Sequence, residues 1–309
     1  MQGILSTQRE ADRQALERDA IRSRGGVLSD TPSLGLTGSL MQDPADRARQ
    51  ERQVWEATVN MMPIAGIMAG VGSKTANMLK LKQAQELAEQ GAKREKIWNE
   101  TGWFKDVDGQ WKYEIDDSGA REFASGGQHL PGYEGNLSDV LHHQHGYTAY
   151  PDTNKITFES VFGDGGGYIP YVDHMQRGMS SKTPNISKTL HELQHAIQHR
   201  EKFAQGGNPS GPYPSGERAK LIERKINEIS KHPANQGDSY DAIKGHAEKF
   251  VDSEYGRMEG YRRLAGEAEA RNVQTRMDFT PAERMAKPPW TTLDVPEDEL
   301  LVRGVLGGK

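Results

Sequence analysis

Apolar positions near the middle of the chain recur with helical spacing. The intervals are four, three and four residues, and the positions are Ile186, Leu190, Leu193 and Ile197. Such spacing places them along one face of a helix. Thr183 offers a capping side chain and Pro184 suits a first helical turn. The pattern therefore predicts an amphipathic helix that begins near residue 184 and is stopped by the glycine pair at 206–207.

Alternating and β-branched positions predict strands on the N-terminal side of this helix. Residues 102–115 carry aromatic and β-branched side chains around Asp108 and Gly109, a pair typical of a hairpin turn. Two further strands are expected over residues 155–162 and 167–172. The glycine-rich residues between them are not followed by a helix with Lys-Ser/Thr, so they form a turn and not a phosphate loop.

Polar helices account for most of the remaining chain. They are expected over residues 43–61, 74–98, 137–145, 217–231, from 240 onward and over 261–271. The order predicts an α+β fold, in which a small, mainly antiparallel sheet packs beside the central helix and later long helices, after a helical N-terminal arm. Four parts follow from this: a flexible arm (1–40), a helical hairpin that docks on a partner or packs on the main domain (41–98), the α+β domain (99–280) and an extended C-terminal tail (281–309).

Composition narrows the function classes. The 309 residues carry a formal net charge of −5 and no cysteine. A surface that coats nucleic acid is therefore disfavoured, and thiolate ligands and disulfides are excluded. Any metal must be bound by His, Asp or Glu. The N-terminus lacks the basic-then-apolar order of a secretory signal, and the apolar run at residues 61–71 is too short to span a bilayer.

The central helix carries His191, Glu192 and His195 in the order His-Glu-x-x-His. Residues four apart share a helix face, so both imidazoles can bind one metal ion while Glu192 points at a water beside it. Zinc lowers the pKa of a bound water to about 7, and Glu192 is placed to take its proton. The pattern predicts zinc-dependent hydrolysis, with an ordinary polar helix as the alternative.

A zinc ion with two histidine ligands needs a third protein ligand and keeps one position for water. Glu267 and Glu269 are the candidates, because both lie among small residues on the predicted helix over 261–271. Spacing alone does not choose between them. Arg271 on the same helix either stabilises an oxyanion or pairs with a glutamate, and we favour the ion pair.

Further histidines and tyrosines lie outside the His-Glu-x-x-His pattern. His199 continues the four-residue spacing, and we expect it to cap the helix or support a ligand from behind. Three histidines do not share one helix face, which favours capping or solvated roles over a metal site: His142, His143 and His145. Three residues are equal candidates for a hydrogen-bond donor to the transition state: His246, Tyr255 and Tyr261.

Several short strings resemble one known family. They are TGWF at 101–104, DGQW at 108–111, EIDD at 114–117, HELQHAIQ at 191–198, GEAEAR at 266–271, PPW at 288–290 and DVP at 294–296. With them, residues 96–303 resemble the zincin-like metallopeptidase domain of large polyvalent proteins from phages and conjugative elements. The resemblance implies a gluzincin-type zinc site, completed by a glutamate in a Glu-x-x-Ala string. Glu267 fits that string, and Glu269 does not.

Two function classes follow from these features. The first is a phage- or mobile-element-encoded zinc metalloendopeptidase that cuts a phage or host polypeptide, in the virion or the host cytoplasm. The second is a structural or injected virion protein with a vestigial or structural metal site, docked onto particle proteins through residues 1–98. For the enzyme, we expect strand 155–162 or 167–172 to border the cleft and bind extended substrate by strand addition.

Overall fold

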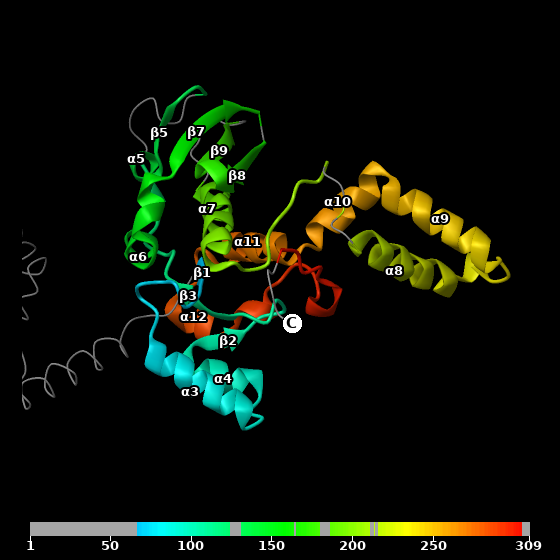
Figure 1. The fold of residues 1–309 in the computed structure, drawn as a ribbon, viewed down its shortest axis with the longest axis horizontal. Helices are drawn as coiled ribbons and strands as arrows, with labels where there is room; N and C mark the ends of the chain where they lie inside the picture. Colours follow the sequence, from blue (N-terminus) through cyan, green and yellow to red (C-terminus); the bar gives the residue numbers. More distant parts are fainter. Residues whose placement is uncertain are drawn as a thin grey trace, which may run out of the picture. The chain divides into compact units, whose positions relative to one another are not determined.

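The computed structural model describes residues 67–123, 131–163, 165–179, 186–210, 213 and 216–304 (Figure 1). The predicted arm over residues 1–40, the helix expected over 43–61 and the Thr183-Pro184 cap lie outside the described residues. The predicted α+β class is confirmed, because helices and small sheets alternate along the described chain.

Helices form most of the regular structure in the described residues. In chain order they are α3 (Met78–Glu89), α4 (Arg94–Thr101), α5 (Leu137–Val140), α6 (Gln144–Ala149), α7 (Ile186–Glu201), α8 (Glu217–Lys231), α9 (Tyr240–Asp252), α10 (Glu254–Arg262), α11 (Ala265–Arg276) and α12 (Pro281–Ala286). None of these helices combines the length and apolar composition that crossing a bilayer requires.

The described strands form three small sheets. The first has the order β1 (Ile67–Ala69), β3 (Trp111–Ile115), β2 (Trp103–Lys105); the second pairs β4 (Arg121–Glu122) with β6 (Leu141–His142); the third has the order β5 (Glu134–Asn136), β7 (Thr157–Phe162), β9 (His174–Met179), β8 (Gly166–Ile169). Pairing is antiparallel except between β7 and β9. The mainly antiparallel arrangement is therefore as predicted, with one parallel exception.

The predicted hairpin is present as β2 and β3. Gly102 ends α4 with a left-handed φ of 72°, so the chain turns directly into β2. Asp108 Oδ1 accepts the backbone N–H of Gln110 at 3.0 Å, and Gly109 has a φ of 78° that few other residues adopt. The local turn chemistry thus sets the register of Trp103 opposite Tyr113.

Helix α7 contributes to the main hydrophobic core and lies beside the third sheet and α11 (Figure 1). Its side chains Leu190, Leu193 and Ile197 are at most 1% exposed, which confirms the predicted apolar stripe. They belong to one cluster with Phe158 and Met175 of the third sheet. The helix ends at Glu201, before the glycine pair expected to stop it, because Lys202 has a left-handed φ of 59°.

Several predicted elements are interrupted in the structure. The helix expected over 74–98 is two helices, α3 and α4, because Gly91 has a φ of 76°. The helix expected over 137–145 ends after Val140, and the next two residues pair with β4. The strand expected over 167–172 ends at Ile169 and continues as a 3-10 turn. The helix expected over 261–271 is divided at Leu264 between α10 and α11.

The segment before residue 98 and the predicted C-terminal tail both pack against the domain. Ala69, Leu81 and Ile97 share the core of α7, so a boundary at residue 98 would cut through one compact unit. In the tail, Trp290 packs on Trp98 with ring centroids 6.0 Å apart, and α12 is helical. The described residues 67–98 therefore pack on the main domain, which is one of the two alternatives for the predicted hairpin, and the tail contains α12 as well as extended chain.

Candidate metal centre

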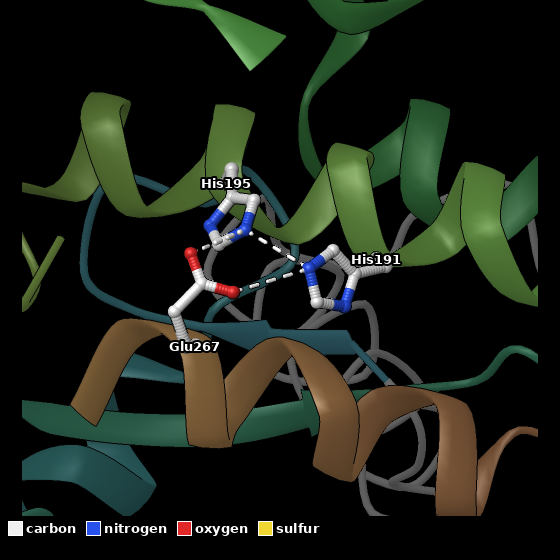
Figure 2. A group of neighbouring side chains, drawn as sticks. All are labelled: His191, His195 and Glu267. Carbon is white, nitrogen blue, oxygen red and sulfur yellow. Dashed lines mark hydrogen bonds and ion pairs between the residues drawn. The ribbon is translucent and has the colours of Figure 1, made fainter. Parts of the chain in front are cut away.

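Helix α7 places two imidazoles on a face separate from its apolar stripe. His191 and His195 are one turn apart, and their side chains are 14% and 15% exposed. Figure 2 shows both rings pointing from α7 toward α11. The buried stripe fixes the rotation of the helix, and the four-residue spacing then brings the two rings together.

Glu267 lies in the first turn of α11, and its carboxylate meets both rings (Figure 2). Its Oε2 is 3.4 Å from Nε2 of His191, and its Oε1 is 3.4 Å from Nε2 of His195. The two Nε2 atoms are 3.1 Å apart. Within the described part of the chain, no other group of His, Cys, Asp and Glu residues is placed to hold a metal ion.

These distances fit a tetrahedral zinc ion. Zinc binds histidine nitrogen and carboxylate oxygen at about 2.0–2.2 Å, so neighbouring ligand atoms of a tetrahedron lie about 3.3–3.5 Å apart. The two Nε2 atoms are 3.1 Å apart, and each lies 3.4 Å from a different oxygen of Glu267, so these contacts are close to that spacing and the carboxylate faces the rings with both oxygens. The three side chains therefore fit the group that the His-Glu-x-x-His pattern implies.

Two glutamines determine which ring nitrogen of each histidine faces the centre. Gln274 Oε1 lies 3.2 Å from Nδ1 of His191, and Gln198 Oε1 lies 2.8 Å from Nδ1 of His195. The amide nitrogen of Gln274 donates to the carbonyl and hydroxyl of Ser187. The amide nitrogen of Gln198 donates to the carbonyl of Gly266 and to Oε2 of Glu269. Both Oε1 atoms are thus left to accept Nδ1–H, and each neutral ring presents its Nε2 lone pair to the centre.

A positive charge is needed where these groups meet, because two lone pairs and a carboxylate face one another. Burial lowers the pKa of His195, but hydrogen bonding to Glu267 and its negative charge outweigh burial and raise that pKa to about 9. Burial raises the pKa of Glu267, whereas hydrogen bonds from His191 and His195 hold it well below its usual range. A metal cation can replace the proton that these shifts favour.

A glycine loop closes around the carboxylate. A Cβ on Gly206 would lie 2.3 Å from Oε1 of Glu267 and 2.5 Å from Cε1 of His195. The N–H of Gly207 donates to the same Oε1 at 2.8 Å. A Cβ on Gly266 would lie 2.4 Å from the backbone of this loop. The glycine pair expected to stop the helix instead allows the loop to approach the centre.

The centre opens into a cavity of about 470 Å³. Strand β8 contributes Gly166, Gly167 and Tyr168 to the wall. Because β8 is an edge of the third sheet, one side of its backbone is not paired by that sheet. Of the two strands expected to border the cleft, the structure favours 167–172, since β7 lies between β5 and β9 inside the sheet.

Glu192 shares the cavity with the two histidines. Burial raises the pKa of its carboxyl, and the nearby His195 and His191 only partly offset this effect. Its Oε2 is buried with no hydrogen-bond partner among the described residues. A carboxylate with a free oxygen and a raised pKa is suited to accept a proton from a water in the cavity.

The other acidic and basic candidates lie outside this group. Glu269 contacts Lys112, with Oε1 to Nζ at 2.9 Å, so it is not placed as the alternative ligand. Burial raises its pKa to about 7. Arg271 forms an ion pair, but its partner is an aspartate and not the expected glutamate, with Nε 2.9 Å from Oδ2 of Asp294. His199 is exposed on the next turn of α7, and its ring lies tilted beside that of Tyr168 with centroids 6.5 Å apart.

The structure separates the three transition-state candidates. Tyr261 lines the cavity, and burial together with the neighbouring charge of Glu267 raises the pKa of its hydroxyl. Tyr255 is 72% exposed and packs on Phe250. His246 is exposed on α9. Tyr261 alone of the three borders the cavity.

The histidines at 142, 143 and 145 are not part of a metal group. His143 is buried and caps α6, where its Nδ1 accepts the N–H of Gly146 at 3.4 Å. Its Nε2 lies 3.1 Å from Asp117. His145 lies 3.7 Å from Asp116. The capping role favoured for this cluster is found for one of its members.

Sequence reasoning missed the residues that support or line the centre. Gln198 was detectable, because it follows His195 by three positions and so shares its helix face. No comparable signal pointed to Gln274, because it lies on α11 and not on α7. The same holds for Gln205 and Arg303, which line the cavity.

Comparison with known proteins places part of the chain in a polyvalent-protein context. The family model described as large polyvalent protein associated domain 23 matches residues 66–124. The matched segment contains β1 to β4 with α3 and α4, and it ends before α7. No curated protein and no solved structure matches the chain.

Proposed function

We propose that this chain is a zinc-dependent metallopeptidase of a phage or mobile element. The observation that carries the proposal is the meeting of His191, His195 and Glu267 at 3.1 to 3.4 Å beside Glu192. The orientation of both rings by glutamine oxygens supports it, because zinc ligation requires the Nε2 lone pairs. The polyvalent-protein match is consistent with this origin.

Each residue has a defined part in peptide hydrolysis. His191, His195 and Glu267 would hold zinc, which supplies a Lewis acid and lowers the pKa of a bound water. Glu192 accepts the proton of the attacking water and delivers it to the leaving amine. Tyr261 is placed to donate a hydrogen bond to the oxygen on which negative charge develops.

The proposed substrate is an extended polypeptide of phage or host origin. An extended segment can pair with the free edge of β8, where backbone hydrogen bonds position the peptide in the cavity. Docking on particle proteins through residues 1–98, and action in the virion or host cytoplasm, belong to the same proposal. No nucleic-acid partner is proposed.

Zinc content and peptide hydrolysis, measured together, test the proposal. We expect the wild-type chain to hold one zinc ion and to cut peptides in an unbiased library. Glu192→Gln should keep zinc and lose about 10²–10⁴ in rate, since it removes only the base. His191→Ala and His195→Ala should lose zinc, and Glu267→Ala should bind it more weakly.

Glu201→Gln is the control, because Glu201 lies on α7 but bonds Tyr150 and Gly72 away from the cavity. It should keep both zinc and activity. Zinc at stoichiometric level without any hydrolysis would support the structural role. Absence of zinc binding would overturn the metal centre itself.

A further inference from the structure

Lys112 lies in the interior, which lysine rarely occupies without charge partners. Its side chain is 1% exposed, on strand β3. The ammonium nitrogen lies 2.7 Å from Asp106, 3.1 Å from Asp108 and 2.9 Å from Glu269, and 4.4 Å from the centre of the Phe203 ring. The β2–β3 turn is already formed by the bond from Gln110 to Asp108 and by the positive φ of Gly109. The turn therefore does not explain why three carboxylates surround Lys112.

The three carboxylates come from two different parts of the fold. Asp106 and Asp108 belong to the turn between β2 and β3, and Asp108 Oδ2 also accepts the N–H of Ala204 at 2.9 Å. Glu269 belongs to α11, two residues after the proposed ligand Glu267. Lys112 therefore joins the hairpin to the helix that completes the metal centre.

From Glu269 a continuous line of hydrogen bonds leads to a ligand. Oε1 of Glu269 faces Lys112, and Oε2 accepts the amide N–H of Gln198 at 2.7 Å. The second amide hydrogen of Gln198 goes to the carbonyl of Gly266 at 2.8 Å. Oε1 of Gln198 is thereby left 2.8 Å from Nδ1 of His195.

The direction of each bond is determined by its neighbours. If the Gln198 amide were reversed, its oxygen would face the acceptors of Glu269 and Gly266, and its nitrogen would face Nδ1 of His195. Nδ1 of His195 would then have to accept a hydrogen bond from the amide nitrogen, so the ring proton would lie on Nε2. A protonated Nε2 has no lone pair to bind the metal. The carboxylate of Glu269 prevents this reversal.

We propose that Lys112 is a positioning residue of the metal centre, acting through Glu269 and Gln198 to keep Nε2 of His195 free for the metal. The inference rests on the proposed function. Lys112 and both turn aspartates lie within the family-matched segment 66–124, whereas the histidines do not. The matched segment thus contributes to a centre whose ligands lie elsewhere in the chain.

Zinc affinity of the full chain, measured by competition with a chelator, tests this role. Glu269→Gln keeps the side-chain shape but offers only one acceptor oxygen for two donors, Lys112 and Gln198. We expect it to weaken zinc binding about 10- to 100-fold, the usual loss when a partner of a metal ligand is removed. Gln198→Leu should give a similar loss, and so should Lys112→Met where circular dichroism shows it folded.

Two matched controls separate positioning from packing. Glu114→Gln removes another buried carboxylate, one that pairs with Arg276 at 2.5 Å and does not reach His195. Gln194→Leu removes a buried glutamine of α7 that bonds the carbonyl of Met68. Both should lower thermal stability yet bind zinc within about twofold of wild type. Cobalt in place of zinc adds a second readout, since its visible spectrum should change in Glu269→Gln and stay unchanged in Glu114→Gln.

The outcomes distinguish this inference from the proposed function. If the wild type binds zinc and folded Glu269→Gln and Lys112→Met bind it within twofold of wild type, with an unchanged cobalt spectrum, the positioning role is overturned and the proposed function stands. If the wild type binds no zinc, both are overturned.

Discussion

Tyr261 lies at the wall of the cavity, where its neutral hydroxyl hydrogen-bonds Glu267 and is the proposed donor to a developing oxyanion. We predict that Tyr261→Phe lowers kcat about 10²-fold, since loss of one such donor costs about 10²–10³. Zinc affinity should also fall, because the Tyr261 hydroxyl hydrogen-bonds the proposed ligand Glu267, so kcat is compared at full zinc loading. Steady-state kinetics on the zinc-loaded protein, with metal content measured alongside, check this.

Tyr255→Phe is the control, because Tyr255 is exposed and outside the cavity. It should match the wild type in kcat and zinc content. A Tyr261→Phe protein that loses zinc but retains kcat when fully loaded would show that Tyr261 supports Glu267 and does not act on the substrate.

Part of the metal centre was predictable from single residues. His191, Glu192 and His195 lie within five positions, so helix geometry alone converts their spacing into a shared site. Glu267 and Glu269 could not be separated in this way. Residues two apart project about 200° from each other on a helix, so only one of the two glutamates can face the pair of imidazoles. Which one does so depends on how α11 packs, and only the family resemblance pointed to Glu267.

At the scale of elements, the first turn of α11 packs directly on the loop that follows α7. A Cβ on Gly266 would lie 2.4 Å from backbone atoms of Gln205 and Gly206. We predict that Gly266→Ala lowers the free energy of unfolding by about 2–3 kcal/mol, because backbone cannot move aside as a side chain can. Urea unfolding measures this, and zinc affinity should fall with it.

Gly245→Ala provides the opposite case. Gly245 lies inside α9, and a Cβ there would meet nothing within 4 Å. The change should raise the free energy of unfolding by roughly 0.5–1 kcal/mol, because alanine loses less backbone entropy in a helix. Equal effects of the two substitutions would contradict the close approach at Gly266.

Helices and strands with a clear periodicity or turn residues of their own were predictable from the sequence. Strands that are held extended by pairing with other strands were not. α7, α8 and the β2–β3 hairpin follow from periodicity and turn residues. Strand β9 was missed, because the sequence HMQRGM over His174–Met179 has neither alternation nor β-branched residues. Its extended state comes from pairing with β7 and β8 on both sides. The pairing of β9 with its two neighbours, parallel to β7 and antiparallel to β8, cannot be predicted from the sequence of β9 alone.

At the scale of the whole described unit, the segment matched by the family model does not contain its own core. Trp98 packs on Trp290 and donates to the carbonyl of Met285. Lys112 takes one of its carboxylates from α11. Packing therefore continues across the division expected between residues 98 and 99.

We predict that residues 66–124, produced alone, do not fold. Buried Glu114 would lose its partners Arg276 and Arg284, and an unpaired buried charge costs about 3–5 kcal/mol. Lys112 would keep Asp106 and Asp108 but lose Glu269. A two-dimensional amide NMR spectrum should show narrow proton dispersion. The full chain, which supplies Glu269 and Arg276, should show wide dispersion. Wide dispersion for the isolated fragment would contradict the shared core.

The buried pair of Glu114 and Arg276 also bears on the order of events during synthesis. The two residues are 162 positions apart, so at about 5–20 residues per second Arg276 is added roughly 8–32 s after Glu114. Throughout that interval the carboxylate has no guanidinium to neutralise it and must stay hydrated. The hairpin is made early, yet its inner face can dehydrate only after α11 has left the ribosome.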